Sequence, residues 1–464
     1  MSGPTVLIMA AGEGTRMRSS LPKMLHPVCG RAMIAWPVLA ARDAGADRVC
    51  VIVSPERDLG PALPEGTETI VQPEPDGTGG AIRAALDVIR ASDLVVVVNG
   101  DHPLITGELI ASVVDDHREA AAAATVVTVD RDDPTSLGRV VRDGDGAFER
   151  IVETKYPEGI PAEVLAIREV NTNTFVFDAA ALADAIARVS NDNSAGEYYI
   201  GDALELIREG GGLVRVDKVG DVSVNVGVNN RAELAIATAI ARQRILERHM
   251  LAGVTVTDPE TTWVEAEVEI EPDSVIEPGT YLRGTTRVGR ASVVGPHTTL
   301  IDSVLGAEVS VPHSYLVQCD VADRCQVGPY AYLRPGATLR EGAKAGTFVE
   351  VKNSVLGEGA KVPHLSYIGD ADVGAGSNLG AGTITANYDG SRKHRTKIGR
   401  DVRTGVDTAL VAPVDVGDAA YTGAGSVITE DVPPGALGIS RAEQANVEGF
   451  ADRKAREEDE ESED

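Results

Sequence analysis

Apolar runs alternate with helix-like segments through the first half of the chain. The segments TVLIMAA (5–11), RVCVIVS (48–54) and LVVVVNGD (94–101) are apolar on both faces, as buried strands are. The segments AMIAWPVLAARDAG (32–45) and GGAIRAALDVIRAS (79–92) lie between them and have helical character. This alternation predicts a Rossmann-like α/β domain, in which helices cover both faces of a parallel sheet.

The second half of the chain follows a different period. Residues 231–251 contain neither Gly nor Pro and predict one connecting helix. After Gly253, mostly aliphatic residues recur every six positions, a period that suits neither a helix nor a two-faced strand. Such hexapeptide repeats predict a left-handed parallel β-helix, whose coils each have three flat sides. The repeated positions are Val264, Ile270, Ile276, Leu282, Val288, Val294 and Leu300, then, after a slip in phase, Val327, Leu333, Leu339, Ala345 and Val351, and later Ile398, Thr404, Leu410, Val416, Thr422 and Ile428.

These patterns divide the chain into four parts. We expect an α/β domain over 1–230, a linker helix over 231–252, a β-helix over 253–445 and an acidic tail over 446–464. The tail ends in EEDEESED, and such a run of like charges repels itself and cannot bury a core. We therefore expect the tail to be disordered.

One stretch interrupts the hexapeptide period. The segment ANYDGSRKHRTK (386–397) is basic in an otherwise acidic chain. It is either a solvated excursion from the coil or a flap over an anionic ligand.

Charge and composition narrow the class of protein. The chain has 43 Lys and Arg against 71 Asp and Glu, a net charge of −28, which disfavours binding to nucleic acid. Its four cysteines do not make a disulfide framework and are expected to be buried thiols. No segment has the length of a membrane span or the pattern of a signal peptide. We expect a soluble cytoplasmic protein without nucleic-acid or membrane partners.

The first strand leads into the segment AAGEGTRMRSSLPKM (10–24). It is not a dinucleotide fingerprint, because Met17 stands where the third glycine belongs, and it lacks the GK[ST] of a P-loop. What remains is a glycine-containing turn whose N–H groups can face phosphate oxygens. Arg16 and Lys23 follow within reach of that phosphate.

The order of motifs along the chain then points to a family. LIMAAGEGTRM…LPKML, DGTGGA, NGD, DPTSLGRV, IVETK, VNTNTFVF, GEYYIGD and VGVNNR together resemble the sugar-nucleotide pyrophosphorylases. With the hexapeptide half, residues 4–445 resemble the bifunctional family that makes UDP-N-acetylglucosamine. The resemblance implies acetyl-CoA-dependent N-acetylation of glucosamine-1-phosphate. It also implies uridylyl transfer from UTP to N-acetylglucosamine-1-phosphate, with release of pyrophosphate.

Nucleotidyl transfer explains the residue types of the first half. Positioning and charge stabilisation carry such a reaction, so a divalent metal and cationic side chains are needed. Asp101, which ends an apolar strand, is the expected Mg²⁺ ligand, and the resemblance pairs it with Asn229. Arg16 and Lys23 are the expected catalytic cations. The resemblance assigns the UDP-N-acetylglucosamine site to Met9, Ala10, Ala11, Gly12, Lys23, Gln72, Gly77, Thr78, Asn99, Gly100, Asp101, Gly138, Glu153, Asn171 and Asn229.

One position departs from the family pattern. The family commonly reads Gln-x-x-Gln-x-Gly-Thr-Gly, with the second Gln expected at the uracil, whereas this chain has Pro75 there. Proline offers no side-chain amide, so we expect Gln72 or backbone groups to contact the base.

The segment KVPHLSYIGD supplies the chemistry of the second half. A lone histidine is usually structural, but His364 lies among residues that match the family's acetyltransferase motifs. Histidine titrates near neutral pH and suits deprotonation of the glucosamine amine, so His364 is the expected general base. Arg334 is expected to bind the sugar phosphate, with Lys352, Tyr367 and Asn378 holding the sugar. The resemblance assigns acetyl-CoA to Ala381, Asn387, Tyr388, Val406, Ala424 and Arg441, although Val406 stands where the family commonly has Ser.

The resemblance also implies a homotrimer with acyl sites between subunits. Two other functions remain open: a related pyrophosphorylase whose β-helix is only an assembly module, and a scaffold whose two sites have decayed. A zinc carbonic anhydrase is disfavoured, because His297, His313, His364 and His394 lack an evident ligand spacing.

Overall fold

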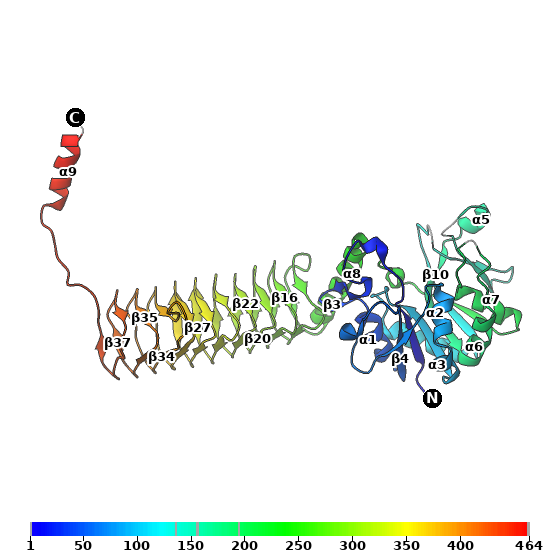
Figure 1. Ribbon diagram of the computed structural model, residues 1–464, viewed down its shortest axis with the longest axis horizontal. Helices are drawn as coiled ribbons and strands as arrows, with labels where there is room; N and C mark the ends of the chain where they lie inside the picture. The colour runs from blue at the N-terminus through cyan, green and yellow to red at the C-terminus, as the bar shows by residue number, and fades with distance from the viewer. Residues whose placement is uncertain (1, 135–136, 155–156, 194, 462–464) are drawn as a thin grey trace. The chain divides into compact units, whose positions relative to one another are not determined.

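In the computed structural model, placement is described for residues 2–134, 137–154, 157–193 and 195–461 (Figure 1). The chain forms two compact units. The first unit comprises Met1–Glu247 and Glu265–Glu267, and the second comprises Arg248–Val264 and Val268–Asp464. Each unit is described by itself below.

A mixed sheet forms the centre of the first unit. Its main path has the strand order β11-β7-β10-β6-β1-β4-β5, and β8 and β9 extend it beside β10. The three predicted strands, β1, β4 and β6, pair in parallel as expected, whereas the later strand β10 runs antiparallel to both β6 and β7. The apolar pattern of a buried strand is the same in either direction, so it did not reveal the reversal. The strand bounds are β1 Thr5–Met9, β4 Arg48–Val53, β5 Glu68–Val71, β6 Leu94–Asn99, β7 Ala124–Asp130, β8 Arg139–Arg142, β9 Phe148–Val152, β10 Glu169–Asp178 and β11 Val214–Lys218.

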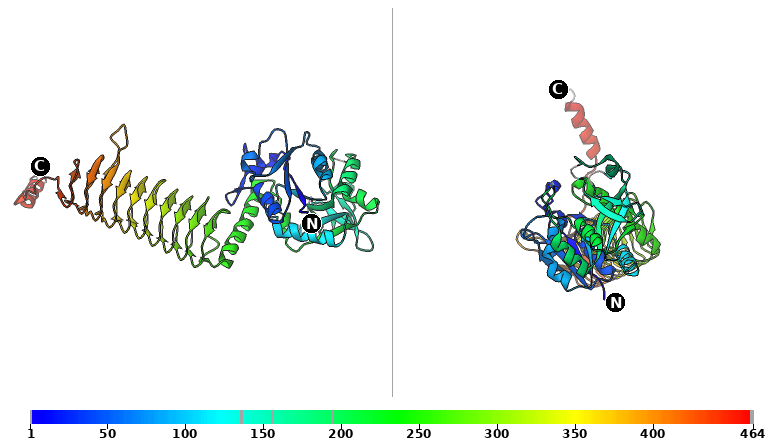
Figure 2. Two further views of the ribbon diagram at one scale, coloured as in Figure 1. Left: turned by 90° about the horizontal axis from the view of Figure 1, so that it is seen from below. Right: turned by 90° about the vertical axis from the view of Figure 1, so that its right-hand side faces the viewer.

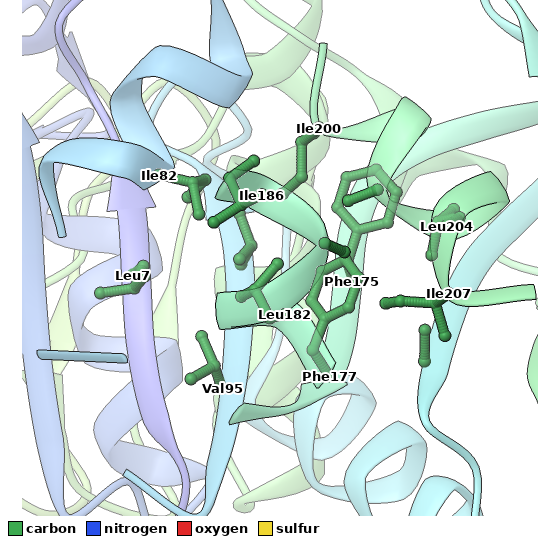
Figure 3. Close-up of a cluster of buried hydrophobic side chains, with 14 of the residues drawn as sticks. Leu7, Ile82, Val95, Phe175, Phe177, Leu182, Ile186, Ile200, Leu204 and Ile207 are labelled. Atoms are coloured by element: carbon green, nitrogen blue, oxygen red, sulfur yellow. The ribbon is translucent and has the colours of Figure 1, made fainter. Parts of the chain in front are cut away.

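Helices cover both faces of this sheet, as the apolar pattern predicts. Alternate residues of β1 enter different cores: Leu7 joins one core and Val6 joins the other. The core around Leu7 includes side chains from α2, α3, α6 and α7, among them Leu182 and Leu204 (Figure 3). The core around Val6 is closed by α1 and α4. The helix bounds are α1 Ala35–Asp43, α2 Thr78–Ala84, α3 Leu86–Arg90, α4 Gly107–Glu119, α5 Ala162–Leu165, α6 Ala179–Arg188 and α7 Gly201–Glu209.

The predicted connecting helix is α8, Arg231–Leu251. The side chain of Asn230 caps its first turn by accepting hydrogen bonds from the N–H groups of Ala232 and Glu233. The boundary between the two compact units falls within α8, between Glu247 and Arg248. None of the described helices combines the length and the apolar character that a membrane crossing needs.

Three parallel sheets form the second unit, which is the predicted left-handed β-helix (Figures 1 and 2). All the repeated positions named above are buried inside the coils. One sheet runs from β12 (Thr255–Val256) to β30 (Lys361–His364), and another from β14 (Glu269–Ile270) to β36 (Val414–Val416). The remaining sheet consists of β13 Trp263–Val264, β16 Tyr281–Arg283, β19 Thr299–Ile301, β22 Tyr315–Val317, β25 Tyr332–Leu333, β28 Glu350–Lys352, β31 Tyr367–Gly369, β33 Ile384–Ala386, β35 Ala409–Val411 and β38 Val427–Ile428.

Sides that are one residue short explain the slip in the six-residue period. The inward residue after Leu300 is Leu305, and both are buried. Between them, Asp302 turns the corner with a φ of 47°. Short sides therefore keep the inward positions aligned while the sequence spacing changes from six to five.

The basic segment 386–397 leaves the coil between β33 and β34 (Thr396–Ile398) (Figure 2). A bridge between Tyr388 and Lys393 closes it into a short antiparallel hairpin.

The acidic tail differs from our expectation of disorder. Phe450–Glu461 forms helix α9, and residues 462–464 lie outside the described part of the chain. An i,i+4 ion pair between Lys454 and Glu458 supports the helix, as do its good helix formers. Repulsion between like charges opposes the formation of a buried core in the tail, but it does not prevent a local helix there.

Candidate active sites

The glycine turn after β1 positions a buried lysine. Gly14 has a φ of 65°, and a Cβ added there would lie 2.5 Å from Cβ of Lys23. Only glycine therefore suits both the conformation and the close approach. Lys23 begins a short 3-10 helix (Lys23–Leu25) and is 8% exposed. The packing around its side chain therefore fixes the direction of its ammonium group.

Cations and oxygen acceptors from distant parts of the chain meet at this lysine. Nζ of Lys23 lies 2.5 Å from Oδ2 of Asp101 and donates to Oδ1 of Asn229 at 3.1 Å. Nη2 of Arg16 donates to the same Asn229 oxygen at 2.9 Å. The structure thus brings together the two predicted catalytic cations and the two predicted metal ligands.

Neighbouring groups hold the two acceptors in place. Asp101 follows β6, and its carbonyl accepts from the N–H of Val228, which joins the two acceptor segments. Oε2 of Glu233 accepts from the N–H of Asn229 at 2.6 Å. Burial lowers the pKa of His102, so its ring is neutral near pH 7 beside Asp101. Glu233 and His102 were not identified from the sequence.

A pocket of about 320 Å³ opens beside this cluster. Thr78 at its wall is fixed by a hydrogen bond that its Oγ1 accepts from the N–H of Ile200. Predicted site residues in the lining are Met9, Ala11, Gly12, Lys23, Gln72, Gly77, Thr78, Asn99 and Asp101. The lining also contains Met24, Pro75, Ala81 and Glu197, which the sequence analysis did not assign to the site. Glu197 belongs to the motif GEYYIGD, which could have drawn attention to it.

Two predicted nucleotide residues lie behind the pocket. Ala10 is buried in the sheet core, and its N–H bonds to Ile52 in the neighbouring strand. The N–H of Gly100 bonds to the carbonyl of Met9, and a Cβ at Gly100 would lie 3.0 Å from that oxygen. These two residues shape the backbone of the pocket wall.

The three predicted sugar-site residues form a separate group: Gly138 directly precedes β8, Glu153 directly follows β9, and Asn171 lies on β10. The N–H of Asn171 donates to the carbonyl of Gly138 at 3.0 Å. A Cβ at Gly138 would lie 3.1 Å from Oε1 of Glu153. Within the described residues, neither Gly138 nor Asn171 forms a hydrogen bond with Lys23 or Asp101. Parts of the motifs DPTSLGRV and IVETK, at residues 135–136 and 155, lie outside the described residues.

The cluster around Lys23 suits a divalent cation. Asp101 and Asn229 direct their oxygens at one point, which the Lys23 ammonium group approaches. Over the described ranges, no group of three or more His, Cys, Asp or Glu side chains forms a complete metal cage. Mg²⁺ does not need one, because it is commonly held by one or two carboxylates together with substrate phosphates.

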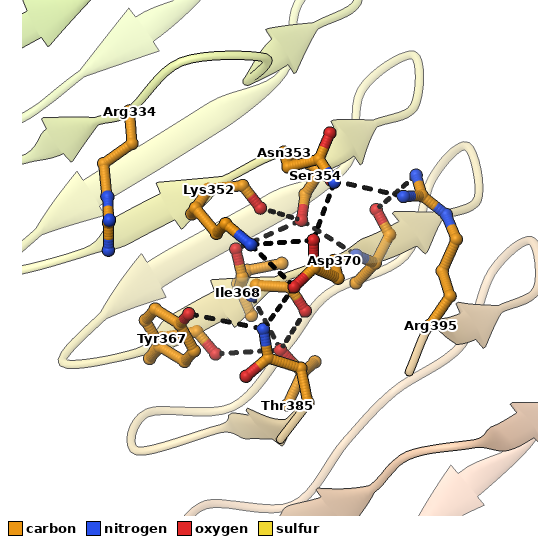
Figure 4. Close-up of polar contacts among 12 residues, drawn as sticks. Arg334, Lys352, Asn353, Ser354, Tyr367, Ile368, Asp370, Thr385 and Arg395 are labelled. Carbon is orange, nitrogen blue, oxygen red and sulfur yellow. Dashed lines mark hydrogen bonds and ion pairs between the residues drawn. The ribbon is translucent and has the colours of Figure 1, made fainter. Parts of the chain in front are cut away.

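In the β-helix, Asp370 is the centre of a second polar cluster (Figure 4). Its carboxylate accepts from Nζ of Lys352 at 2.8 and 2.9 Å, from Asn353 at 2.7 Å and from Asn387 at 2.5 Å. Nδ2 of Asn387 also lies 3.5 Å from the Tyr367 hydroxyl. Two predicted residues from different coils, Lys352 and Asn387, therefore meet at a carboxylate that was not predicted, although it ends the quoted motif KVPHLSYIGD. Tyr367 joins them through Asn387.

Burial and hydrogen bonding act in opposite directions on Asp370. Burial raises the pKa of its carboxyl group, but the hydrogen bonds from Lys352, Asn353 and Asn387 outweigh burial and hold it below the ordinary value. Asp370 is therefore ionised at neutral pH and fixes the Lys352 ammonium group at the surface of the coil.

His364 and Arg334 lie at the ends of strands β30 and β25, which belong to different sheets of the β-helix. His364 is exposed at the end of β30, and the following strand, β31, begins at Tyr367. No described side chain forms a hydrogen bond with its imidazole ring. Arg334 follows β25, donates to Glu350 at 2.9 Å and bonds through its N–H to Val351, next to Lys352.

The residues predicted for acetyl-CoA follow a column of successive coils. The N–H of Gly382 bonds to the carbonyl of His364, and that of Asp407 bonds to the carbonyl of Ala381. The N–H of Gly425 in turn bonds to the carbonyl of Val406. Nη1 of Arg441 donates to the carbonyl of Ala424. Asn378 pairs with strand β30 on one side and with Arg403 on the other, and Tyr388 is exposed on the hairpin.

Most basic groups of the hairpin already have acidic partners. Arg395 pairs with Asp372, and Nε2 of His394 lies 2.7 Å from Oδ2 of Asp389. The hydrogen bond from the Arg392 N–H and that from His394 lower the pKa of Asp389 to about 2. These contacts brace the hairpin internally, and in the described part of the chain the Arg392 and Lys393 side chains form no ion pair.

Comparison with known proteins identifies relatives that match this chain over nearly its whole length. Residues 6–203 match the family model of the MobA-like NTP transferase domain. A protein of Streptomyces avermitilis named "Bifunctional protein GlmU" is 45% identical over 456 residues, which is 97% of this chain and 94% of that protein. Proteins of the same name from Streptomyces coelicolor and Corynebacterium glutamicum are 46% and 43% identical, each over 97% of this chain and 94% of its own length.

Proposed function

Because the chain belongs to the family of bifunctional GlmU proteins, we propose that it is a two-site enzyme of UDP-N-acetylglucosamine synthesis. The second unit transfers acetyl from acetyl-CoA to glucosamine-1-phosphate. The first unit transfers uridylyl from UTP to N-acetylglucosamine-1-phosphate and releases pyrophosphate. The coexistence of the Lys23 cluster and the Asp370 cluster in one chain supports this proposal best.

In the uridylyltransferase site, the sugar phosphate oxygen attacks the α-phosphorus of UTP as pyrophosphate leaves. Lys23 and Arg16 stabilise the charge that gathers on the phosphates, and their hydrogen bonds to Asn229 hold them in place beforehand. Met9, Ala11 and Gly12 form the wall beside the nucleotide. Gly138, Glu153 and Asn171 hold the N-acetylated sugar.

Asp101 and Asn229 are the proposed Mg²⁺ ligands. When bound, the ion neutralises phosphate charge and helps to align the reacting groups. Lys23 would then move its hydrogen bonds from these oxygens to the phosphates.

In the acetyltransferase site, His364 accepts a proton from the glucosamine amine as that amine attacks the thioester carbonyl. Its exposure and the absence of a described side-chain partner suit this role. Lys352 and Tyr367 bind the sugar beside His364, with Asn378 on the adjacent coil. Arg334 binds the sugar phosphate, and the column that runs from Ala381 to Arg441 holds acetyl-CoA with Asn387 and Tyr388.

We also propose that the β-helix forms a homotrimer with acyl sites between subunits. Tyr330 and Phe348 stack at 5.3 Å on one corner of the coil, and their exposed fractions are 55% and 57%. Leu365, adjacent to His364, continues this corner and is 62% exposed. Such an exposed apolar row is typical of a surface that another subunit covers. The proposed compartment is the cytoplasm, which suits four buried free cysteines.

Reciprocal variants test the two-site proposal. His364→Ala should lower acetyl transfer by about a thousandfold while uridylyl transfer is unchanged, because it removes the general base. Asp101→Asn should lower uridylyl transfer by about a hundredfold or more while acetyl transfer is unchanged. Thiol release from acetyl-CoA and pyrophosphate release from UTP measure the two activities separately.

Metal removal provides an independent control. EDTA should abolish pyrophosphate release and leave thiol release intact, and Mg²⁺ should restore the former. Equal loss of both activities in either single variant would contradict the two-site proposal.

A further inference from the structure

Two acceptors from the segment after β5 determine how the amide of Gln72 is oriented. Gln72 is 5% exposed and lines the nucleotide pocket. Its Nε2 donates to Oδ1 of Asp76 at 2.8 Å and to the carbonyl oxygen of Gly77 at 3.2 Å. The Asp76 carboxylate and the Gly77 carbonyl both serve as acceptors here, so the amide nitrogen must face both of them. A flipped amide would place its oxygen against two acceptors.

The amide oxygen is therefore the polar atom that Gln72 has left for a ligand. Among the described residues, Oε1 of Gln72 accepts no hydrogen bond. Pro75, at the same wall of the pocket, adds no polar side chain. An acceptor at this position favours a base that presents an N–H group, as uracil does at N3, over cytosine, whose N3 is itself an acceptor.

The position of Asp76 is itself closely constrained. Its carbonyl accepts from the N–H of Tyr198 at 2.8 Å, and the N–H of Gly79 bonds back to the carbonyl of Tyr198 at 2.7 Å. A Cβ added to Gly80 would lie 1.7 Å from Oδ1 of Asp76. The carboxylate thus occupies space that exists only because residue 80 has no side chain.

We propose that Asp76 is a positioning residue for base selection: it holds the Gln72 amide so that Oε1 accepts from N3–H of uracil. The proposal rests on the uridylyltransferase activity proposed above. Asp76 acts through Gln72 and does not touch the reacting phosphates.

The test compares kcat/KM for UTP and CTP in pyrophosphate release by the full chain. Asp76→Ala should lower the UTP-to-CTP ratio by about tenfold, which is the usual contribution of one hydrogen bond. Asp76→Asn should stay within about twofold of the parent, because its Oδ1 still accepts from Gln72. A role that depended on charge would instead affect both variants equally.

Two further variants link the effect to Gln72. Gln72→Ala should lower the ratio by a similar factor, and adding Asp76→Ala should lower it no further, because both changes remove one interaction. Glu74→Ala removes a nearby exposed acid whose side chain forms no hydrogen bond with Gln72, so it should leave the ratio unchanged. If Asp76→Ala fails to fold, Gly80→Ala takes its place, since it displaces the carboxylate without removing it.

The outcomes separate this inference from the proposed function. A parent chain that releases no pyrophosphate from UTP would overturn the proposed function. If the parent prefers UTP and Asp76→Ala keeps the full UTP-to-CTP ratio, only the positioning role is overturned. The same conclusion follows if adding Asp76→Ala to Gln72→Ala lowers that ratio further.

Discussion

Single acceptor groups organise the charged residues of both sites. Oδ1 of Asn229 accepts hydrogen bonds from Arg16 and Lys23. The Asp370 carboxylate accepts hydrogen bonds from Lys352 and from the side-chain amides of Asn353 and Asn387. In each case cations are held near their working positions by the protein itself. This arrangement reduces the ordering that substrate binding would otherwise require.

Asp370→Asn should destabilise the β-helix by about 3 kcal/mol at pH 7, because it leaves the Lys352 ammonium group without its buried partner. The folded-state pKa of Asp370 is depressed, so its stabilisation is complete above the ordinary value of 3.8 and is lost as the pH falls through the folded-state value. The difference in the free energy of unfolding between Asp370→Asn and the parent should therefore become smaller below about pH 4. Calorimetric unfolding of the full chain at several pH values measures it.

The neighbouring pair of Asp372 and Arg395 supplies the control. Both side chains are more than a third exposed, so Asp372→Asn should change stability by less than about 1 kcal/mol. Equal effects of the two substitutions would contradict the special role of Asp370.

At the scale of elements, short connections position the proposed catalytic groups. The glycine turn after β1 presents Lys23, and the end of β6 presents Asp101. The first unit also includes the short segment Glu265–Glu267, which lies beyond α8 in the sequence. Within that unit the N–H of Ala266 bonds to the carbonyl of Cys29, and Glu267 pairs with Arg31 at 2.8 Å.

Truncation should separate the two chemistries. A fragment that ends at Leu251 should remain a folded uridylyltransferase, in keeping with the proposed domain boundaries at 230/231 and 252/253. A fragment that ends at Glu267 should be more stable by about 1 kcal/mol, because it restores the Ala266 hydrogen bond and the Arg31 ion pair. Urea unfolding compares the fragments. A folded but inactive shorter fragment would contradict the domain assignment.

At the scale of the whole molecule, two folds supply two kinds of surface. The mixed sheet offers a pocket at the ends of its strands, where phosphate chemistry is expected. The β-helix offers columns of aligned positions, because each coil repeats the one below it. The exposed corner with Tyr330, Phe348 and Leu365 is one such column, and the proposed trimer would cover it.

Phe348→Glu should convert the proposed trimer into monomers and lower acetyl transfer strongly, while uridylyl transfer is retained. Burying a carboxylate in an apolar interface is unfavourable. Sedimentation velocity measures the assembly. Val304→Glu is the matched control, because Val304 lies on strand β20 and not on the exposed corner that carries Phe348. This substitution should leave the assembly intact. A trimer that persists in Phe348→Glu would place the interface elsewhere.

The sequence by itself determined the features that depend on local pattern. The period of six predicted the β-helix, because every coil must place a small or aliphatic residue inward at regular spacing. Motif order identified the family and thereby led to the proposed roles of His364, Lys23 and Asp101. These features can be predicted because each is carried by neighbouring residues.

Only the tertiary structure decided which side chains meet. Arg16 and Asn229 are separated by 213 positions, and no local pattern encodes their hydrogen bond. The same holds for the antiparallel direction of β10 and for Asp370, whose partners come from other coils. Asp76 lies only four residues from Gln72, yet its role depends on a space that Gly80 leaves open. Contacts of this kind follow from how packed elements approach one another, which the order of residues specifies only through the complete fold.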